Sequence, residues 1–124
     1  MGVNIQSRNF DQVLDETESF EVVVVENQEF YSVSLQVTAY GDPVDYDIVE
    51  LLGPDEINTN AGVSRRSMSY ALANAGPFGA NANPKARNHP QYGPRAGWKI
   101  TNNAPERRVF RGTLTWTVAS GSDA

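Results

Sequence analysis

The chain has 124 residues, no cysteine and a formal net charge of −5. This length suits a single domain that buries roughly two-thirds of the unfolded chain's surface. The missing cysteines exclude disulfide bonds, thiolate metal sites and cysteine nucleophiles. No window approaches the ~20 consecutive apolar residues of a membrane-spanning helix. Residues 1–20 lack the basic start and apolar block of a secretory signal, so we expect synthesis in a cytoplasm.

The charges are distributed unevenly along the sequence. Residues 1–56 contain thirteen acids and one base, for a charge of −12, whereas residues 57–124 contain nine bases and two acids, for +7. One interpretation is that strands from the two halves interleave, so that the charges pair within the chain. The other is a dipolar subunit whose acidic face binds the basic face of a neighbour. The sequence leaves both open.

The predicted elements begin with an N-terminal arm. Val3 and Ile5 alternate with polar residues as in a short strand, and the apolar residues that follow have no sustained period. We therefore predict an extended arm with one short strand over residues 1–18. Residues 19–25 alternate in hydrophobicity, which predicts a strand with an apolar inner face.

Residues 30–52 form the centre of the predicted fold. Residues 30–40 alternate apolar and polar side chains, which predicts a strand with one dry and one wet face. Residues 44–52 are rich in β-branched and aromatic side chains and predict a strand covered more fully on both faces. Gly-Asp-Pro at residues 41–43, like the polar residues 26–29, has the composition of a turn. We predict a hairpin of these two strands at the centre of a sheet.

The composition changes after Gly-Pro-Asp at residues 53–55, which ends the third strand. Ala, Asn, Gly and Pro dominate residues 57–97. Within them, residues 67–73 alternate in hydrophobicity, which favours a short strand over one helical turn. Loops beyond ~12–15 residues are uncommon in compact domains and are usually functional or disordered. We predict that residues 57–97 are a long loop that serves as an interaction arm and is ordered by neighbouring subunits.

The last part of the chain returns to strand patterns. Residues 98–101 predict a short strand, and residues 108–119 predict one with apolar residues on one face and threonines on the other. The pattern indicates an all-β fold, a single antiparallel sandwich or barrel of about six or seven strands over residues 1–124. The predicted core consists of Phe20, Val22, Val24, Tyr31, Val33, Leu35, Val37, Ile48, Leu51, Ile100, Phe110, Leu114, Trp116 and Val118.

The sequence contains no motif that indicates catalysis. His89 is the only histidine, so a Ser-His-Asp arrangement or a His-based metal site would have to use it alone. The glycine-rich pieces carry proline where a phosphate-binding loop needs backbone N–H donors. We predict a protein that is not an enzyme and has no cofactor.

Asp42, Asp45 and Asp47 place three carboxylates within six residues. Clusters of oxygen ligands suit hard cations, which makes these residues a weak calcium candidate. The spacing is not that of an EF-hand, because the glycine at loop position 6 and the glutamate at position 12 are missing. Asp45 and Asp47 also fit the wet face of a strand, and we do not expect a metal.

Residues 85–98 mix Lys and Arg with Tyr and Trp. This mixture suits stacking on single-stranded nucleic acid, and it equally suits a protein interface. The acidity of residues 1–56 repels phosphate, so we favour the interface and expect neither a nucleic-acid nor a membrane partner. The predicted interface residues are Arg65, Arg66, Phe78, Tyr92, Arg95 and Trp98.

These features resemble, in class only, small virion proteins: cysteine-free β domains with long arms, such as the decoration and minor structural proteins of tailed phages. The resemblance implies a structural assembly protein, a virion-associated homo-oligomer whose subunits bind through extended arms and complementary charge. The alternative is a β-sandwich module that binds carbohydrate or another surface ligand through Tyr70, Tyr92 and Trp98.

Overall fold

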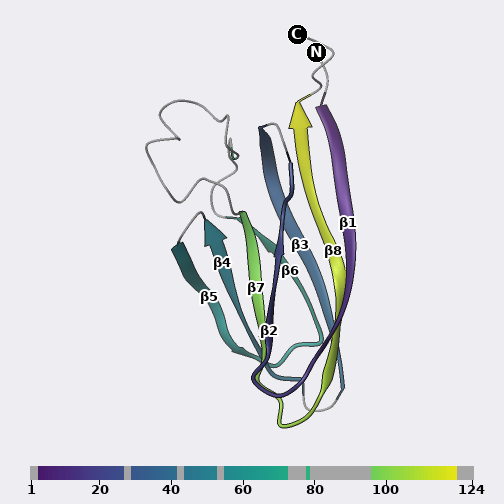
Figure 1. The fold of residues 1–124 in the computed structure, drawn as a ribbon, viewed down its shortest axis with the longest axis vertical. Coiled ribbons are helices and arrows are strands. Elements are labelled where there is room, and N and C mark those ends of the chain that lie inside the picture. The colour runs from purple at the N-terminus through teal and green to yellow at the C-terminus, as the bar shows by residue number, and fades with distance from the viewer. Residues whose placement is uncertain are drawn as a thin grey trace.

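The computed structural model describes residues 3–26, 29–41, 44–52, 55–72, 78 and 96–119. The strands are β1 (Val3–Leu14), β2 (Ser19–Val23), β3 (Phe30–Tyr40), β4 (Tyr46–Leu52), β5 (Asp55–Val63), β6 (Ser67–Ala71), β7 (Ala96–Asn102) and β8 (Arg108–Ala119) (Figure 1). The predicted all-β fold is confirmed, and the described residues form eight strands in place of the expected six or seven. The described part of the chain has no helix with the length and apolar character to cross a membrane.

The strands form two four-stranded antiparallel sheets that pack face to face (Figure 1). Sheet A has the order β1-β8-β3-β6, and sheet B has the order β2-β7-β4-β5. Apart from β4 and β5, consecutive strands lie in opposite sheets, so the chain crosses repeatedly between the layers. This strand order is that of a jelly roll.

The central hairpin predicted for residues 30–52 is wrong. β3 lies in sheet A between β8 and β6, whereas β4 lies in sheet B between β7 and β5. Residues 26–29 likewise connect strands of different sheets. Hydrophobic alternation shows which face of a strand is buried, but both sheets bury one face in a shared core, so alternation does not select the pairing partner.

The N-terminal arm predicted for residues 1–18 is instead mostly a long strand. β1 pairs with β8 without interruption from Val3 to Leu14. Only Leu14 of its described side chains is fully buried, while Phe10 packs partly against the core. The sequence lacks a strong alternating pattern here because β1 is an edge strand that is stabilised mainly by its backbone hydrogen bonds to β8.

Part of the predicted interaction arm belongs to the sheets. β5 and β6 occupy residues 57–63 and 67–71 of it, so the short strand expected near residues 67–73 is confirmed. β5 pairs with β4 and β6 pairs with β3, and this pairing overrides the weak strand propensity of Ala, Asn and Gly. Residues 73–77 and 79–95 lie outside the described residues.

The core lies between the two sheets. Most of its predicted members are buried, namely Val22, Val24, Val33, Leu35, Val37, Ile48, Leu51, Ile100, Phe110, Leu114, Trp116 and Val118. Phe20 is only partly buried, and its ring centre lies 5.5 Å from that of Phe10. Since β1 and β2 are the edge strands of the two sheets, this pair covers the margin of the core between them.

Phe30 takes the core position predicted for Tyr31. The register of β3 against β8 shifts by one residue between Tyr31 and Ser34, and Ser32 has a left-handed φ of 54°. An extra residue in one strand reverses the face to which the following side chains point. Phe30 and Val33 therefore both point into the core, while Tyr31 is half-buried.

Phe78 and Trp98, predicted as interface anchors, are core residues with no exposed surface. The backbone N–H of Phe78 donates to the carbonyl of Phe30 at 2.9 Å, and the two rings stack with centres 5.5 Å apart. Trp98 lies on β7, opposite Val22 of β2 and Glu50 of β4. A side chain without exposed surface cannot contact a neighbour, so the large apolar area of these rings stabilises this domain instead.

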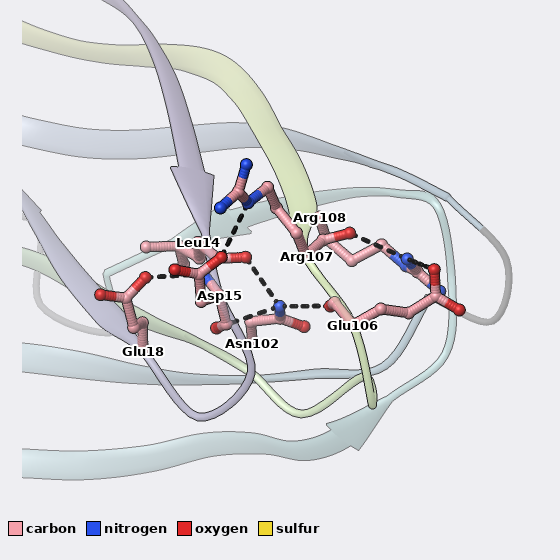
Figure 2. Close-up of polar contacts among 7 residues, drawn as sticks. All are labelled: Leu14, Asp15, Glu18, Asn102, Glu106, Arg107 and Arg108. Atoms are coloured by element: carbon pink, nitrogen blue, oxygen red, sulfur yellow. Dashed lines mark hydrogen bonds and ion pairs between the residues drawn. The ribbon is translucent and has the colours of Figure 1, made fainter.

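A fully buried side chain, that of Asn102, joins three segments at one end of the sandwich (Figure 2). Its Nδ2 donates to the carbonyl oxygens of Leu14, Asp15 and Glu106 at 3.0, 3.2 and 3.0 Å. Its Oδ1 accepts a hydrogen bond from the N–H of Ala104 at 2.9 Å. The side chain thus fixes the end of β1 and the turn between β7 and β8 in one place.

We expect Asn102→Ala to lower the free energy of unfolding by about 2–4 kcal/mol, because several buried backbone groups lose their partner at once. Asn103→Ala is the matched control. The Asn103 side chain is exposed, and its N–H bond to the carbonyl of Asp45 survives the substitution, so we expect a change within about 0.5 kcal/mol. Urea unfolding measures both, and equal losses would contradict the role of the Asn102 side chain.

Gly41 allows a buried arginine to cross the backbone after β3. Its φ of 124° is unfavourable for other residues, and a Cβ at this position would overlap the Arg108 side chain. The Arg108 guanidinium is buried, where its NH1 donates to the carbonyl of Arg107 at 2.9 Å and lies 3.3 Å from Oε2 of Glu106. Arg108 can therefore occupy this place only because residue 41 has no side chain.

We expect Gly41→Ala to cost about 2–4 kcal/mol, because it combines an unfavourable φ with displacement of Arg108. Gly62→Ala is the control: its φ is 66°, but no atom lies within 4 Å of the added Cβ, so a loss of about 1 kcal/mol is expected. Thermal unfolding of the two variants compares them. A smaller loss for Gly41→Ala would show that Arg108 does not depend on the glycine.

Candidate interaction surface

The outer face of sheet A carries small polar side chains in rows across its four strands. Alternation directs the odd-numbered residues of β1, β6 and β8 and residues 34, 36, 38 and 40 of β3 to this face. The strand registers define three successive rows, which are Ser7, Thr115, Ser34 and Ala71; Asn9, Thr113, Gln36 and Ser69; and Asp11, Arg111, Thr38 and Ser67.

Cross-strand hydrogen bonds hold several of these side chains in place. Thr113 donates from its hydroxyl to Oδ1 of Asn9 at 2.8 Å. Nε of Arg111 donates to Oδ2 of Asp11 at 2.9 Å, and both side chains are more than half exposed. Because solvent screens such a pair, it stabilises the fold by at most about 1 kcal/mol. Its main effect is to orient the two side chains.

Three shallow grooves cross this face and meet at Gln36. The largest has a volume of about 520 Å³ and runs over β1, β8 and β3. At one end of it the Arg111 guanidinium lies 5.3 Å from the centre of the Tyr40 ring, a cation–π contact. The grooves offer amide, hydroxyl and charged groups that are already positioned by their neighbours.

The same face exposes apolar side chains at its margin. Ile5 and Val13 of β1 are 74% and 48% exposed, and Tyr40 of β3 is 46% exposed. Val13 and Tyr40 share a row with Val109 of β8, so the face becomes apolar at this end. Ile5 lies near the other end of β1, eight positions away.

Ion pairs connect the acidic and basic halves of the sequence within the chain. Asp11 pairs with Arg111, Asp15 with Arg107 at 2.7 Å, and Glu56 with Lys99. These pairs form because β1 lies beside β8 and because β4 separates β5 from β7 by one strand. Of the two interpretations of the charge asymmetry, pairing within the chain therefore holds for these residues.

The calcium candidate has a structural role at two of its three positions. Oδ1 of Asp45 accepts a hydrogen bond from the Ser64 hydroxyl at 2.9 Å, and Oδ1 of Asp47 accepts one from the N–H of Gly62. Both bonds tie β4 and the residue before it to the end of β5. Asp42 lies outside the described residues, and within the described part no three His, Cys, Asp or Glu side chains are grouped to hold a metal.

The aromatic residues suggested for a carbohydrate site are mostly unavailable. Trp98 is fully buried and Tyr70 is 7% exposed. The Tyr70 hydroxyl lies 3.5 Å from that of Tyr46, and burial raises the pKa of both phenols. Tyr92 lies outside the described residues. Two of the three suggested aromatics are thus buried in the core and do not present a face to a ligand.

Those interface residues predicted from the sequence that the structure describes lie outside this face of sheet A. Arg65 and Arg66 are exposed in the connection between β5 and β6, and Arg95 lies outside the described residues. The sequence pattern indicates that the threonine face of β8 is solvated, but it does not indicate the neighbours of this face, because they come from distant parts of the chain. Only strand pairing brings Asn9, Thr113 and Gln36 side by side.

Comparison with protein-family models, with curated proteins and with solved structures finds no match to this chain.

The buried pair of Tyr46 and Tyr70 is expected to make the folded state less stable as the pH rises into the alkaline range. A phenol whose pKa is raised by folding favours the native state below its unfolded pKa of about 10, and this contribution is lost as the pH rises further. We therefore expect the urea midpoint to fall above pH ~10. The double variant Tyr46→Phe/Tyr70→Phe should flatten this dependence between pH 9 and 11.5. An unchanged slope in the double variant would assign the alkaline loss to other groups.

Proposed function

We propose that this protein is a structural subunit of a larger protein assembly of the virion type, such as a capsid decoration or minor structural protein. The observation that carries the proposal is the jelly-roll strand order, β1-β8-β3-β6 against β2-β7-β4-β5. Viral capsid domains use this architecture, which they share with lectins and cupins. Because these classes share one fold, the surface of the domain has to be used to choose between capsid subunit, lectin and cupin.

Two features of the surface support an assembly role over ligand binding. Trp98 and Tyr70, the aromatics that a carbohydrate module would present, are buried. The exposed groups instead cover a broad sheet face that is polar in the middle and apolar at one end, through Val13 and Tyr40. A mixed surface of this kind suits contact with another protein surface.

The mode of association differs from the one suggested by the sequence. Residues 3–14 are a strand of the domain, and Phe78 and Trp98 belong to its core. We therefore assign the contacts between subunits to the outer face of sheet A and to the exposed Arg65 and Arg66. The partners are other copies of this chain or other subunits of the same particle.

Light scattering after size exclusion, together with electron microscopy, tests the proposal. Purified protein should form species larger than a monomer in a concentration-dependent way. A protein that stays monomeric at all concentrations, and that binds an oligosaccharide in a glycan screen, would overturn the assembly role in favour of the alternative.

Charge reversal tests the exposed arginines. We expect Arg65→Glu to reduce the assembled fraction at low salt, and ~1 M salt, where the Debye length is about 3 Å, to have a similar effect on the unmodified protein. Arg107→Glu is the matched control, since Arg107 is also exposed but pairs with Asp15 in its own chain. Equal effects of the two substitutions would show that net charge, and not the Arg65 site, governs assembly.

A further inference from the structure

The four sheet edges differ in how well they are protected against pairing with another chain. β2 and β6 are edge strands of five residues each. β5 is longer, but its pairing with β4 contains two register shifts. Short strands and bulges are the usual devices that prevent edge-to-edge association. β1 has neither: it spans twelve residues, contains no proline and pairs with β8 without a shift.

The unpaired side of β1 is accessible. In the described structure its only strand neighbour is β8, and it lies at the margin of sheet A (Figure 1). Most of its side chains are exposed, including Asn9 near its midpoint. Arg8, a charge on the inward side that could oppose pairing, donates to the carbonyl of Val23 at 2.7 Å and is thereby held against sheet B.

We propose that β1 pairs antiparallel with β1 of a second copy, about a twofold axis through Asn9. Directly opposed residues of two antiparallel strands point to the same side of the sheet. A twofold axis normal to the sheet must therefore lie between one residue and the same residue of the second copy, and not midway between two consecutive positions. Two axes give the longest overlap of residues 3–14, one through Arg8 and one through Asn9. The axis through Arg8 places this arginine against itself and Ile5 against Asp11 of the second copy, which is unfavourable.

The axis through Asn9 gives a complementary register. Ile5, 74% exposed in the monomer, then faces Val13 of the second copy, 48% exposed, and this contact occurs twice. Ser7 faces Asp11, and Asn9 faces itself, so no like charges meet. The pairing joins the two A sheets into one sheet of eight strands and makes the rows of the outer face continuous across the axis.

This inference rests on the proposed assembly role and specifies one of its contacts. Engineered cysteines test it directly, because the chain contains no cysteine of its own. With Asn9→Cys, the two cysteines face each other across the axis. Their Cα atoms are about 5 Å apart, within the range for a disulfide. With Ser7→Cys, the matched control, the two positions are about 14 Å apart at 3.4 Å per residue, which is too far.

Mild oxidation should therefore give covalent dimers of Asn9→Cys at least about tenfold faster than of Ser7→Cys. A mixture of Ser7→Cys and Asp11→Cys proteins should give the cross-linked heterodimer. Spin labels at positions 9 and 7 provide a second measurement that does not depend on disulfide geometry, with the shorter distance expected at position 9. Equal cross-linking at both positions together with equal label distances would overturn the proposed register.

A second substitution tests the apolar contact. Ile5→Lys should weaken dimerisation by about tenfold or more, since it places a charge against Val13 of the second copy. Val25→Lys is the matched control, because Val25 is 73% exposed and lies outside β1. Equal effects of the two substitutions would overturn the contact.

The outcomes separate this inference from the proposed function. Particles that assemble without preferential cross-linking at position 9 would refute the β1 pairing and leave the assembly role intact. Dimers cross-linked at position 9 that form no larger species would support the pairing and refute the larger assembly. A strict monomer would refute both.

Discussion

The side chain of Asn102 is the contact on which the geometry of one end of the sandwich depends. Its backbone also takes part, since its carbonyl accepts from Thr17 and its N–H donates to Glu18, both at 2.9 Å. The backbone thus aligns β7 with the turn before β2, while the amide holds the end of β1 and the turn before β8. Strands of both sheets are fixed by one residue, because only a primary amide offers donors and an acceptor in a single plane.

The opposite end of the fold is held by aromatic packing. The backbone bridge and ring stacking between Phe78 and Phe30 hold Phe78 at the start of β3. The bulge at Ser32 makes this possible, since it turns Phe30 inward. Hydrogen bonds therefore hold one end of the sandwich and apolar packing holds the other, and a continuous core connects the two ends.

The jelly-roll arrangement also determines which surfaces remain for other molecules. Closing the core between two sheets leaves two outer faces and four edges. On the described surface, Asp11 pairs with Arg111 within sheet A, and Asp15 pairs with Arg107 in the neighbouring turns. The long and regular edge of β1 and the exposed side chains beside it are the features on which the proposed assembly role rests.

Local hydrophobic patterns were sufficient to place most strands and to show which side of each is buried. The alternation of Val33, Leu35 and Val37 and of Phe110, Leu114 and Trp116 is a local property, so it was sufficient for the all-β class and for most of the core. The wet threonine face of β8 followed from the same pattern. The candidate surface as a whole did not, because its rows combine residues that are distant in the sequence, such as Ser7 and Thr115.

The pairing of the strands depends on contacts between distant residues. Two sheets that share a core present equivalent apolar faces, so alternation did not distinguish β8 from β4 as the neighbour of β3. The sequence pattern of β1 indicates only a short strand at Val3 and Ile5, since most of its residues are polar and its pairing with β8 is formed by backbone groups, which carry no sequence signal. Phe78 and Trp98 are aromatic residues in or beside a segment of loop-like composition, and only the packed core showed that they point inward. Sequence patterns are local, whereas pairing and burial depend on contacts between distant residues.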